Sequence, residues 1–139
     1  MSKPVLATAI VVACFVLAAC SPSEDSPSGS LTGKTWQWTA SAADASASQS
    51  AVSDPADYTL VFLKGSFIAK ADCNSVSGTY VTTSSGGVTM KPTSSTEHVC
   101  ATDSLAEAYV ADLSSAASYA FDDGKLEITL SEEGTMTFE

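Results

Sequence analysis

The sequence predicts an α+β domain, in which a curved antiparallel sheet or partial barrel of about eight short strands packs on one helix. Two observations predict this fold class. From residue 31 onward, short alternating or β-branched runs are separated by Gly, Pro, Asp and Ser, which is typical of antiparallel strands joined by tight turns. One later stretch, which begins at Ser104, carries a helix start signal followed by apolar residues at helical spacing.

The expected strands follow one another closely along the chain. In the first, 31–39, Trp36 and Trp38 share one face because side chains alternate along a strand. Residues 58–63 and 66–71 are expected to form a hairpin that turns at Lys64 and Gly65. The remaining strands are expected at 78–83, 88–91, 118–121, 125–130 and 135–138.

One helix is expected to begin at Ser104, because Ser104 and Glu107 have the spacing of a capping box. Its apolar stripe is predicted to consist of Leu105, Ala108, Tyr109, Leu113 and Ala116. Residues 92–100 are expected to be irregular. The Ala- and Ser-rich residues 40–57 are expected to form a long exposed loop, and a tolerated insertion is favoured over a functional one.

Residues 1–19 are predicted to be a lipoprotein signal peptide. A short positive start at Lys3 precedes an apolar run that ends in Leu-Ala-Ala-Cys20, which looks like a bacterial lipobox. The Cys20 thiol would receive diacylglycerol, and several acyl chains together make a stable membrane anchor. The alternatives are an uncleaved helix or an ordinary signal peptide.

The predicted domain organisation follows from this start. Residues 20–30 would be the lipidated cysteine and a flexible tether rich in Ser and Pro, and residues 31–139 the folded domain. We expect an extracytoplasmic protein, lipid-anchored to the cell membrane or, in a two-membrane bacterium, to the outer membrane. Ser21 permits the second destination by resemblance to lipoprotein sorting.

The charge excludes some partners. The chain of 139 residues has a formal net charge of −10 and contains no Arg. Nucleic acid is therefore not an expected partner, because binding a polyphosphate requires an excess of cations. The expected partners are the membrane, through the anchor on Cys20, and an apolar ligand or an envelope protein. The chain is expected to be a monomer.

Two of the four cysteines are available to the folded domain. Cys14 would leave with the signal peptide and Cys20 would be lipidated, which leaves Cys73 and Cys100. In an exported chain two remaining thiols indicate a disulfide, with free thiols as the alternative.

The lone histidine, His98, lies two residues before Cys100 and suggests a reactive pair. A thiolate nucleophile also needs an orienting group and a substrate pocket, and zinc needs three or four ligands. The sequence therefore predicts no catalytic residue, no metal site and no cofactor. A small hydrolase or redox protein that uses Cys100 and His98 is the alternative.

A short motif carries a resemblance to a known family. Its residues are Cys73, Asn74, Ser77, Gly78 and Tyr80, placed between a hairpin and the Ser95-Thr96 and Cys100 segment. With the entry at 31–36, the strand at 58–62, the helix near Leu113 and the closing Leu126 and Phe138, this pattern resembles the META domain family, which is also called HslJ-like. One departure is Asp72, where the family usually has Gly, which enters some backbone conformations more easily.

The resemblance implies a small α+β domain, often lipid-anchored or periplasmic, without established catalytic residues. Its fold is similar to that of pilot lipoproteins of type III secretion, which hold an acyl chain or partner segment in an apolar groove. Family members are linked to envelope stress and antibiotic tolerance. We therefore expect a non-enzymatic, envelope-anchored binding or stress-tolerance module, whose groove between sheet and helix accepts an apolar ligand or partner segment. A purely structural envelope protein is a third class.

Overall fold

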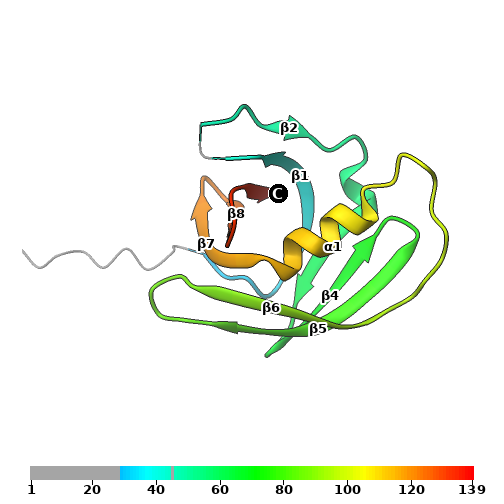
Figure 1. Ribbon diagram of the computed structural model, residues 1–139. Coiled ribbons are helices and arrows are strands. Elements are labelled where there is room, and N and C mark those ends of the chain that lie inside the picture. Colours follow the sequence, from blue (N-terminus) through cyan, green and yellow to red (C-terminus); the bar gives the residue numbers. More distant parts are fainter. Residues whose placement is uncertain (1–28, 45) are drawn as a thin grey trace, which may run out of the picture.

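A computed structural model describes residues 29–44 and 46–139 of the chain. The predicted signal peptide and most of the tether, including Cys20, lie outside these residues. The described chain forms a curled sheet with one helix lying beside its concave face (Figure 1). The strands are β1 (Thr35–Ala42), β2 (Ser50–Ala51), β3 (Tyr58–Phe62), β4 (Ser66–Ala71), β5 (Asn74–Thr82), β6 (Val88–Ser95), β7 (Ala116–Asp122), β8 (Lys125–Leu130) and β9 (Thr135–Phe138). The helices are the 3-10 helix η1 (Pro55–Asp57) and the α-helix α1 (Ala106–Ser114).

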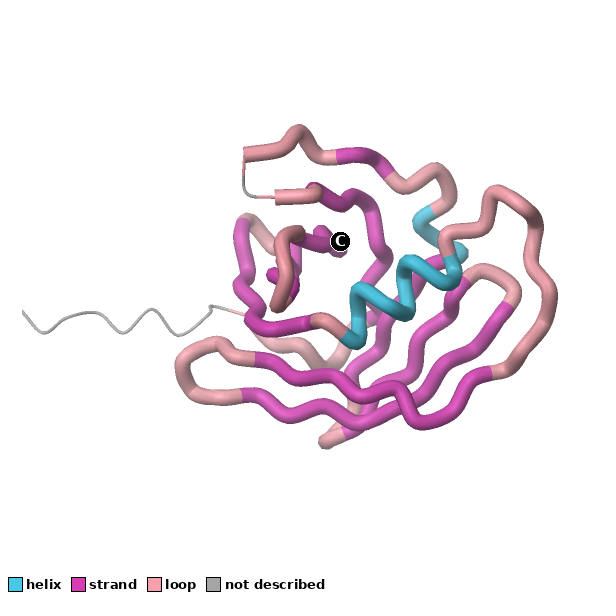
Figure 2. Tube along the Cα trace, viewed as in Figure 1, coloured by secondary structure: helices cyan, strands magenta, loops and turns pink. Residues whose placement is uncertain are grey.

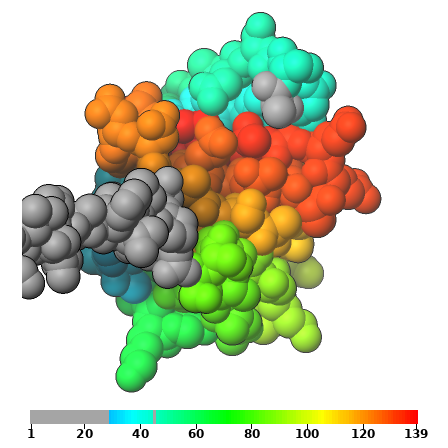
Figure 3. Space-filling view, turned by 90° about the vertical axis from the view of Figure 1, so that its left-hand side faces the viewer, coloured from blue at the N-terminus to red at the C-terminus, as the bar shows by residue number. Residues whose placement is uncertain are grey.

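The sheet curls until its two ends come into contact at one turn. Its strand order is β6-β5-β4-β3-β1-β9-β8-β7, with antiparallel pairing throughout, and β2 adds to β1. The ends touch at the turn before β6, where Gly87 bridges to Ser118 and the Tyr119 N–H donates to the Gly86 carbonyl oxygen at 2.8 Å. Figure 3 views the side where the β5–β6 hairpin (green) and β7 (orange) meet. The predicted fold class, an α+β partial barrel with one helix, is confirmed.

Alternating side chains of the strands fill the space inside the curl. Trp36 and Trp38 are both buried on the inner face, as their spacing predicts. The helix adds Tyr109 and Leu113 to this core, and the Tyr109 ring stacks on Trp38 with 5.1 Å between ring centroids. Burial raises the pKa of Tyr109 far above its usual range, and its neutral hydroxyl donates to the Thr59 carbonyl oxygen at 3.0 Å.

The β5–β6 hairpin is longer than the sequence predicts. The expected strands at 78–83 and 88–91 are extended to Asn74 and Ser95, so the region after Pro92 is not irregular until residue 96. Pro92 is tolerated because it lies in an edge strand, beside a shift of register between Ser77 and Gly78 where the ladder is already interrupted. Cross-strand pairing with β5 thus outweighs the local turn signal.

The prediction of a long exposed loop at 40–57 is wrong in part. β1 continues to Ala42, Ser50–Ala51 pair with it as β2, and η1 follows shortly before β3. Val52 is buried in the core, and its N–H donates to the Thr39 carbonyl oxygen at 2.9 Å. β2 was not predicted because its Ala and Ser side chains show no apolar alternation, whereas its pairing with β1 depends on backbone hydrogen bonds.

The helix begins slightly later than predicted, and its predicted apolar stripe is only partly buried. The capping box does not form, because Leu105 holds the N-cap position and the Ser104 hydroxyl accepts a hydrogen bond from the Ala106 N–H at 3.2 Å. Tyr109, Leu113 and Ala116 are buried as expected, but Leu105 and Ala108 are exposed. The buried or half-buried positions of α1 are Ala106, Tyr109, Val110, Asp112 and Leu113, and Ala116 is buried in β7.

Candidate functional site

A cleft of about 550 Å³ opens between the N-terminal half of α1 and the end of β6. Figure 2 traces the helix (cyan) and the connection that leads from β6 to it (pink), the two segments that carry most of the lining residues. The small apolar lining residues are Ala71, Val76, Ala106, Val110 and Ala111. The polar lining residues are Asn74, Ser95, Thr96, Glu97, His98 and Glu107.

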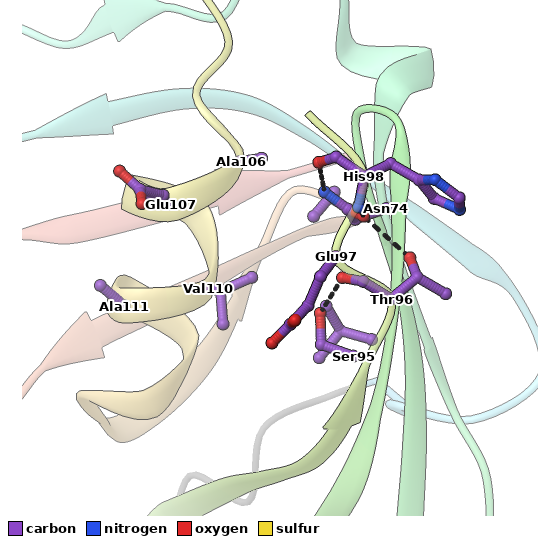
Figure 4. A pocket seen from close by; sticks show the side chains of 11 residues that line it. Asn74, Ser95, Thr96, Glu97, His98, Ala106, Glu107, Val110 and Ala111 are labelled. Carbon is purple, nitrogen blue, oxygen red and sulfur yellow. Dashed lines mark hydrogen bonds between the residues drawn. The ribbon is translucent and has the colours of Figure 1, made fainter. Parts of the chain in front are cut away.

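The floor of the cleft is the inner face of the sheet. Ala71 at the end of β4 and Val76 in β5 are buried and face the helix. Figure 4 shows Val110 of α1 and Glu97 of the opposite wall directed into the space between the walls. A predicted groove between sheet and helix is therefore present, but its lining is mixed in polarity instead of apolar throughout.

Asn74 holds the strand-side wall in place. Its carbonyl oxygen accepts from the Thr96 hydroxyl at 2.9 Å and from the His98 N–H at 2.7 Å. Its amide nitrogen donates to the His98 carbonyl oxygen at 3.0 Å. The Asn74 side chain thus forms hydrogen bonds with three polar groups of the segment that leaves β6. These bonds explain structurally why the family motif has Asn at this position.

A disulfide braces the same wall from the other end. Cys73 and Cys100, the pair expected from the sequence, are bonded, with 5.5 Å between their Cα atoms. Cys73 belongs to the two-residue turn between β4 and β5, and Cys100 to the connection that leads to α1. The wall from Thr96 to Cys100 is therefore held at one end by Asn74, the first residue of β5, and at the other by Cys73 in the β4–β5 turn.

The alternative reactive pair is not assembled in this geometry. The Cys100 sulfur is bonded to Cys73, and the His98 ring is exposed and points away from the helix (Figure 4). Among the described residues, no group of three or more His, Cys, Asp or Glu side chains is placed to hold a metal ion. Nor does the described part of the chain contain a helix long and apolar enough to cross a membrane.

The surroundings of the cleft are acidic. Glu97 and Glu107 each contribute a carboxylate from one wall. A second hollow, at the turn between β4 and β5, is lined by four further carboxylates. These are Asp54, Asp57, Asp72 and Asp103. Lys70 pairs with Asp57 at 2.6 Å, and both side chains are about half exposed.

The rest of the family motif supports the hairpins beneath the cleft. Gly78 faces the core, where a side chain would overlap the Lys91 carbonyl oxygen and the Phe67 ring. Tyr80 packs edge-on against Phe62 and donates its hydroxyl to the Leu63 carbonyl oxygen at 2.8 Å. Ser77 is exposed on the outer face.

Sequence reasoning missed most residues that line the cleft. The sequence did not indicate Glu97, Glu107 or Val110 as site residues. The two walls come from separate segments, 95–98 and 106–111, and no local sequence pattern joins them. The family motif did include Asn74, and its position next to Cys73 was the only sequence feature that pointed to this wall.

Asp72 keeps the left-handed turn with a φ of 56°, so the departure from Gly does not abolish it.

The curled sheet, the single helix and the cleft between them define a small α+β half-barrel domain. Residues 29–139 match the model of the META domain, and the chain therefore belongs to the META domain family. The match begins at Gly29, two residues before the expected start of the domain, where an added Cβ would overlap the Phe121 ring.

Two solved structures share the fold. A protein from Burkholderia xenovorans, solved by NMR, aligns with a TM-score of 0.63 and 19% identity over 78% of this chain and 82% of that chain. A crystal structure of a DUF4847 family protein from Bacteroides vulgatus aligns with a TM-score of 0.58 and 13% identity, over 78% and 92%. At these identities the likeness concerns the fold alone. The comparison with curated proteins gave no match.

Proposed function

We propose that this protein is a non-enzymatic binding module of the cell envelope, with a role in stress tolerance, which takes up an apolar ligand or a segment of a partner protein in the cleft beside α1. The observation that carries the proposal is the braced cleft. Asn74 and the Cys73–Cys100 bridge fix one wall, and the packed helix fixes the other. A preformed site loses little entropy on binding, which favours a binding role.

The arrangement of Cys100 and His98 supports a non-enzymatic role. The Cys100 sulfur is occupied by the disulfide and the His98 ring points outward, so neither forms a nucleophile–base pair across the cleft. The alternative of a hydrolase or redox protein that uses this pair has no observation in its favour.

Anchoring through a lipid on Cys20 completes the proposal and rests on the sequence. The Leu-Ala-Ala-Cys20 box after an apolar run supports it. The described chain starts on one side of the molecule, and the 96–105 connection lies on the other (Figure 1). Such a placement leaves the cleft accessible to partners in the envelope space.

The experiment fills the cleft and measures what the protein retains. We expect the full-length protein, purified from cells in mild detergent, to carry an apolar molecule or peptide that mass spectrometry detects. Val110→Trp, which occupies the space above the floor, should abolish this retention. Val81→Trp is the matched control, because Val81 is 69% exposed on β5 and lines none of the cleft. Equal retention by both variants, with melting temperatures that show both folded, would refute the cleft as the binding site.

A further inference from the structure

β6 ends at Ser95, and the irregular segment 96–99 that follows stays hydrogen-bonded beside the start of β5. The even-numbered residues of the segment bond toward β5. The Thr96 N–H donates to the Ser75 carbonyl oxygen at 3.0 Å, and the His98 N–H donates to Asn74 Oδ1 at 2.7 Å. The Asn74 side chain therefore substitutes for backbone pairing before the point where β5 begins.

The odd-numbered residues of this segment leave their backbone groups open. Successive residues of an extended chain present their backbone groups to opposite sides, so those of Glu97 and Val99 point away from β5. Within residues 29–44 and 46–139, neither of these two N–H groups has a hydrogen-bond acceptor. Lys91 and Pro92 protect the earlier part of the same edge, but 95–99 contains no Lys and no Pro. An open strand edge beside a cleft is a template for the addition of a further strand.

The apolar contacts available to an added strand lie on both sides of this edge. Val76 and Val110 form the floor and the helix side of the cleft. Val99 is fully exposed, although its neighbours on each side are fixed by Asn74 and by the disulfide. A rigidly held, exposed apolar side chain offers contact area at little cost in conformational entropy.

The negative charge of the cleft determines which kind of molecule can occupy it. Glu97 and Glu107 line the cleft, and none of its described lining residues is Lys. A second copy of the chain carries the same net charge of −10, and the segment before residue 29 carries Glu24 and Asp25 beside the predicted anchor. Both would be repelled, as would an anionic lipid headgroup. A cationic occupant is attracted.

We propose that the cleft binds an extended, cationic segment of another protein, which adds to the 95–99 edge as a strand. Alternate apolar side chains of that segment rest on Val76 and Val110, and its Lys or Arg side chains reach Glu97 and Glu107. The cleft volume of about 550 Å³ lies within the range of preformed ligand sites. This inference rests on the proposed binding function and names the class of partner.

The test is a titration followed by NMR, with the full chain in non-ionic detergent micelles. The probe is a synthetic peptide of about eight residues, alternating Lys and Val, which is long enough to pair along the whole edge. We expect saturable shifts of the amide signals of 95–99 and of the first turns of α1. A Glu-Val peptide of the same length, and a Lys-Val peptide N-methylated at alternate residues on its pairing edge, should both fail to bind.

Two double variants separate local charge from net charge. Glu97→Gln with Glu107→Gln should weaken binding by about tenfold, because two exposed ion pairs are lost. Glu132→Gln with Glu133→Gln makes the same change of charge at the β8–β9 turn, away from the cleft, and should leave the affinity within about twofold.

Each contrary outcome has a distinct meaning. Equal weakening by the two double variants, equal binding of the Glu-Val peptide or unimpaired binding of the N-methylated peptide would overturn this inference. Shifts of the cleft signals with sodium oleate, and none with the Lys-Val peptide, would overturn it while the proposed binding function stands. If neither probe perturbs residues 95–111, both proposals fail.

Discussion

Gly78 shows how a single residue of the motif acquires its physical reason only from the fold. Its φ is not positive, so conformational freedom does not explain the glycine. A Cβ at this position would overlap the Lys91 carbonyl oxygen and lie 2.7 Å from a carbon of the Phe67 ring. The inner face of β5 therefore admits no side chain here, because β6 crosses closely at the register shift beside Gly78.

We expect Gly78→Ala to lower the free energy of unfolding by about 1–3 kcal/mol, the usual cost of forcing extra volume into a packed core. Chemical denaturation followed by circular dichroism measures it. Ser77→Ala, at the exposed neighbouring position, should change stability by less than about 0.5 kcal/mol. Equal, small effects of both substitutions would contradict the close packing described for Gly78.

Asp72 is the second residue whose role depends on backbone geometry. It occupies the first position of the turn between β4 and β5 with a φ of 56°, a conformation that favours glycine. Asp72→Gly should raise the free energy of unfolding by up to about 1 kcal/mol, whereas Asp72→Ala, which also removes the carboxylate, should lower it. Thermal melts of the three proteins measure this. Destabilisation by both substitutions would mean that the carboxylate, and not the backbone, decides stability at this turn.

At the scale of elements, the sequence predicted strands better than it predicted their ends. The hairpin of β3 and β4 was found within one residue, because alternation and a Lys-Gly turn agree there. β2 and the second half of β6 were missed, since their pairing depends on a neighbouring strand and not on their own residues. The predicted buried face of α1 is only partly correct. The helix begins at Ala106, later than predicted, and Leu105, which was expected on the apolar stripe, is exposed.

The cleft could not be predicted in detail for a related reason. Its walls are 95–98 and the first turns of α1, and its floor comes from β4 and β5. Sequence reasoning placed a groove between sheet and helix, on the strength of the family resemblance. It could not identify the residues on each wall, because that needs the path of the connection between β6 and α1. The expected disulfide gave one constraint on that path, because it places Cys100 beside the β4–β5 turn.

The bridge between Cys73 and Cys100 should act as one unit. It closes a loop with a sequence separation of 27, for which loop-closure entropy corresponds to about 3–4 kcal/mol. We expect Cys73→Ser and Cys100→Ser to lower the melting temperature equally, and the double variant to be no less stable than either one. Melting temperatures of the oxidised proteins measure this, and the wild type treated with dithiothreitol should resemble the double variant. Additive losses, or two free thiols detected by mass spectrometry in the exported protein, would refute the bridge.

At the scale of the whole molecule, the fold is a partial barrel whose sheet ends meet at one turn only. The turn at Gly86–Gly87, which precedes β6, touches β7, and α1 packs against β6 and β4. Antiparallel alternation and a single helix signal were enough to predict this architecture as a partial barrel. The closing contact was not predictable, because it joins a glycine turn to a strand that shares no sequence pattern with it. The cleft is thus a consequence of incomplete closure.

The anchor is the last prediction and concerns the chain as a whole. Cys20→Ala should remove the acceptor of the lipid, so the protein should no longer stay in the membrane pellet after a high-salt wash. Cys14→Ala, a matched loss of one cysteine inside the predicted signal peptide, should leave lipidation and membrane attachment unchanged. Metabolic labelling with a radioactive fatty acid, followed by fractionation, measures both properties. Retention of the full-size Cys20→Ala protein in the washed membrane would instead indicate that the apolar run at 5–19 holds the protein there as an uncleaved helix.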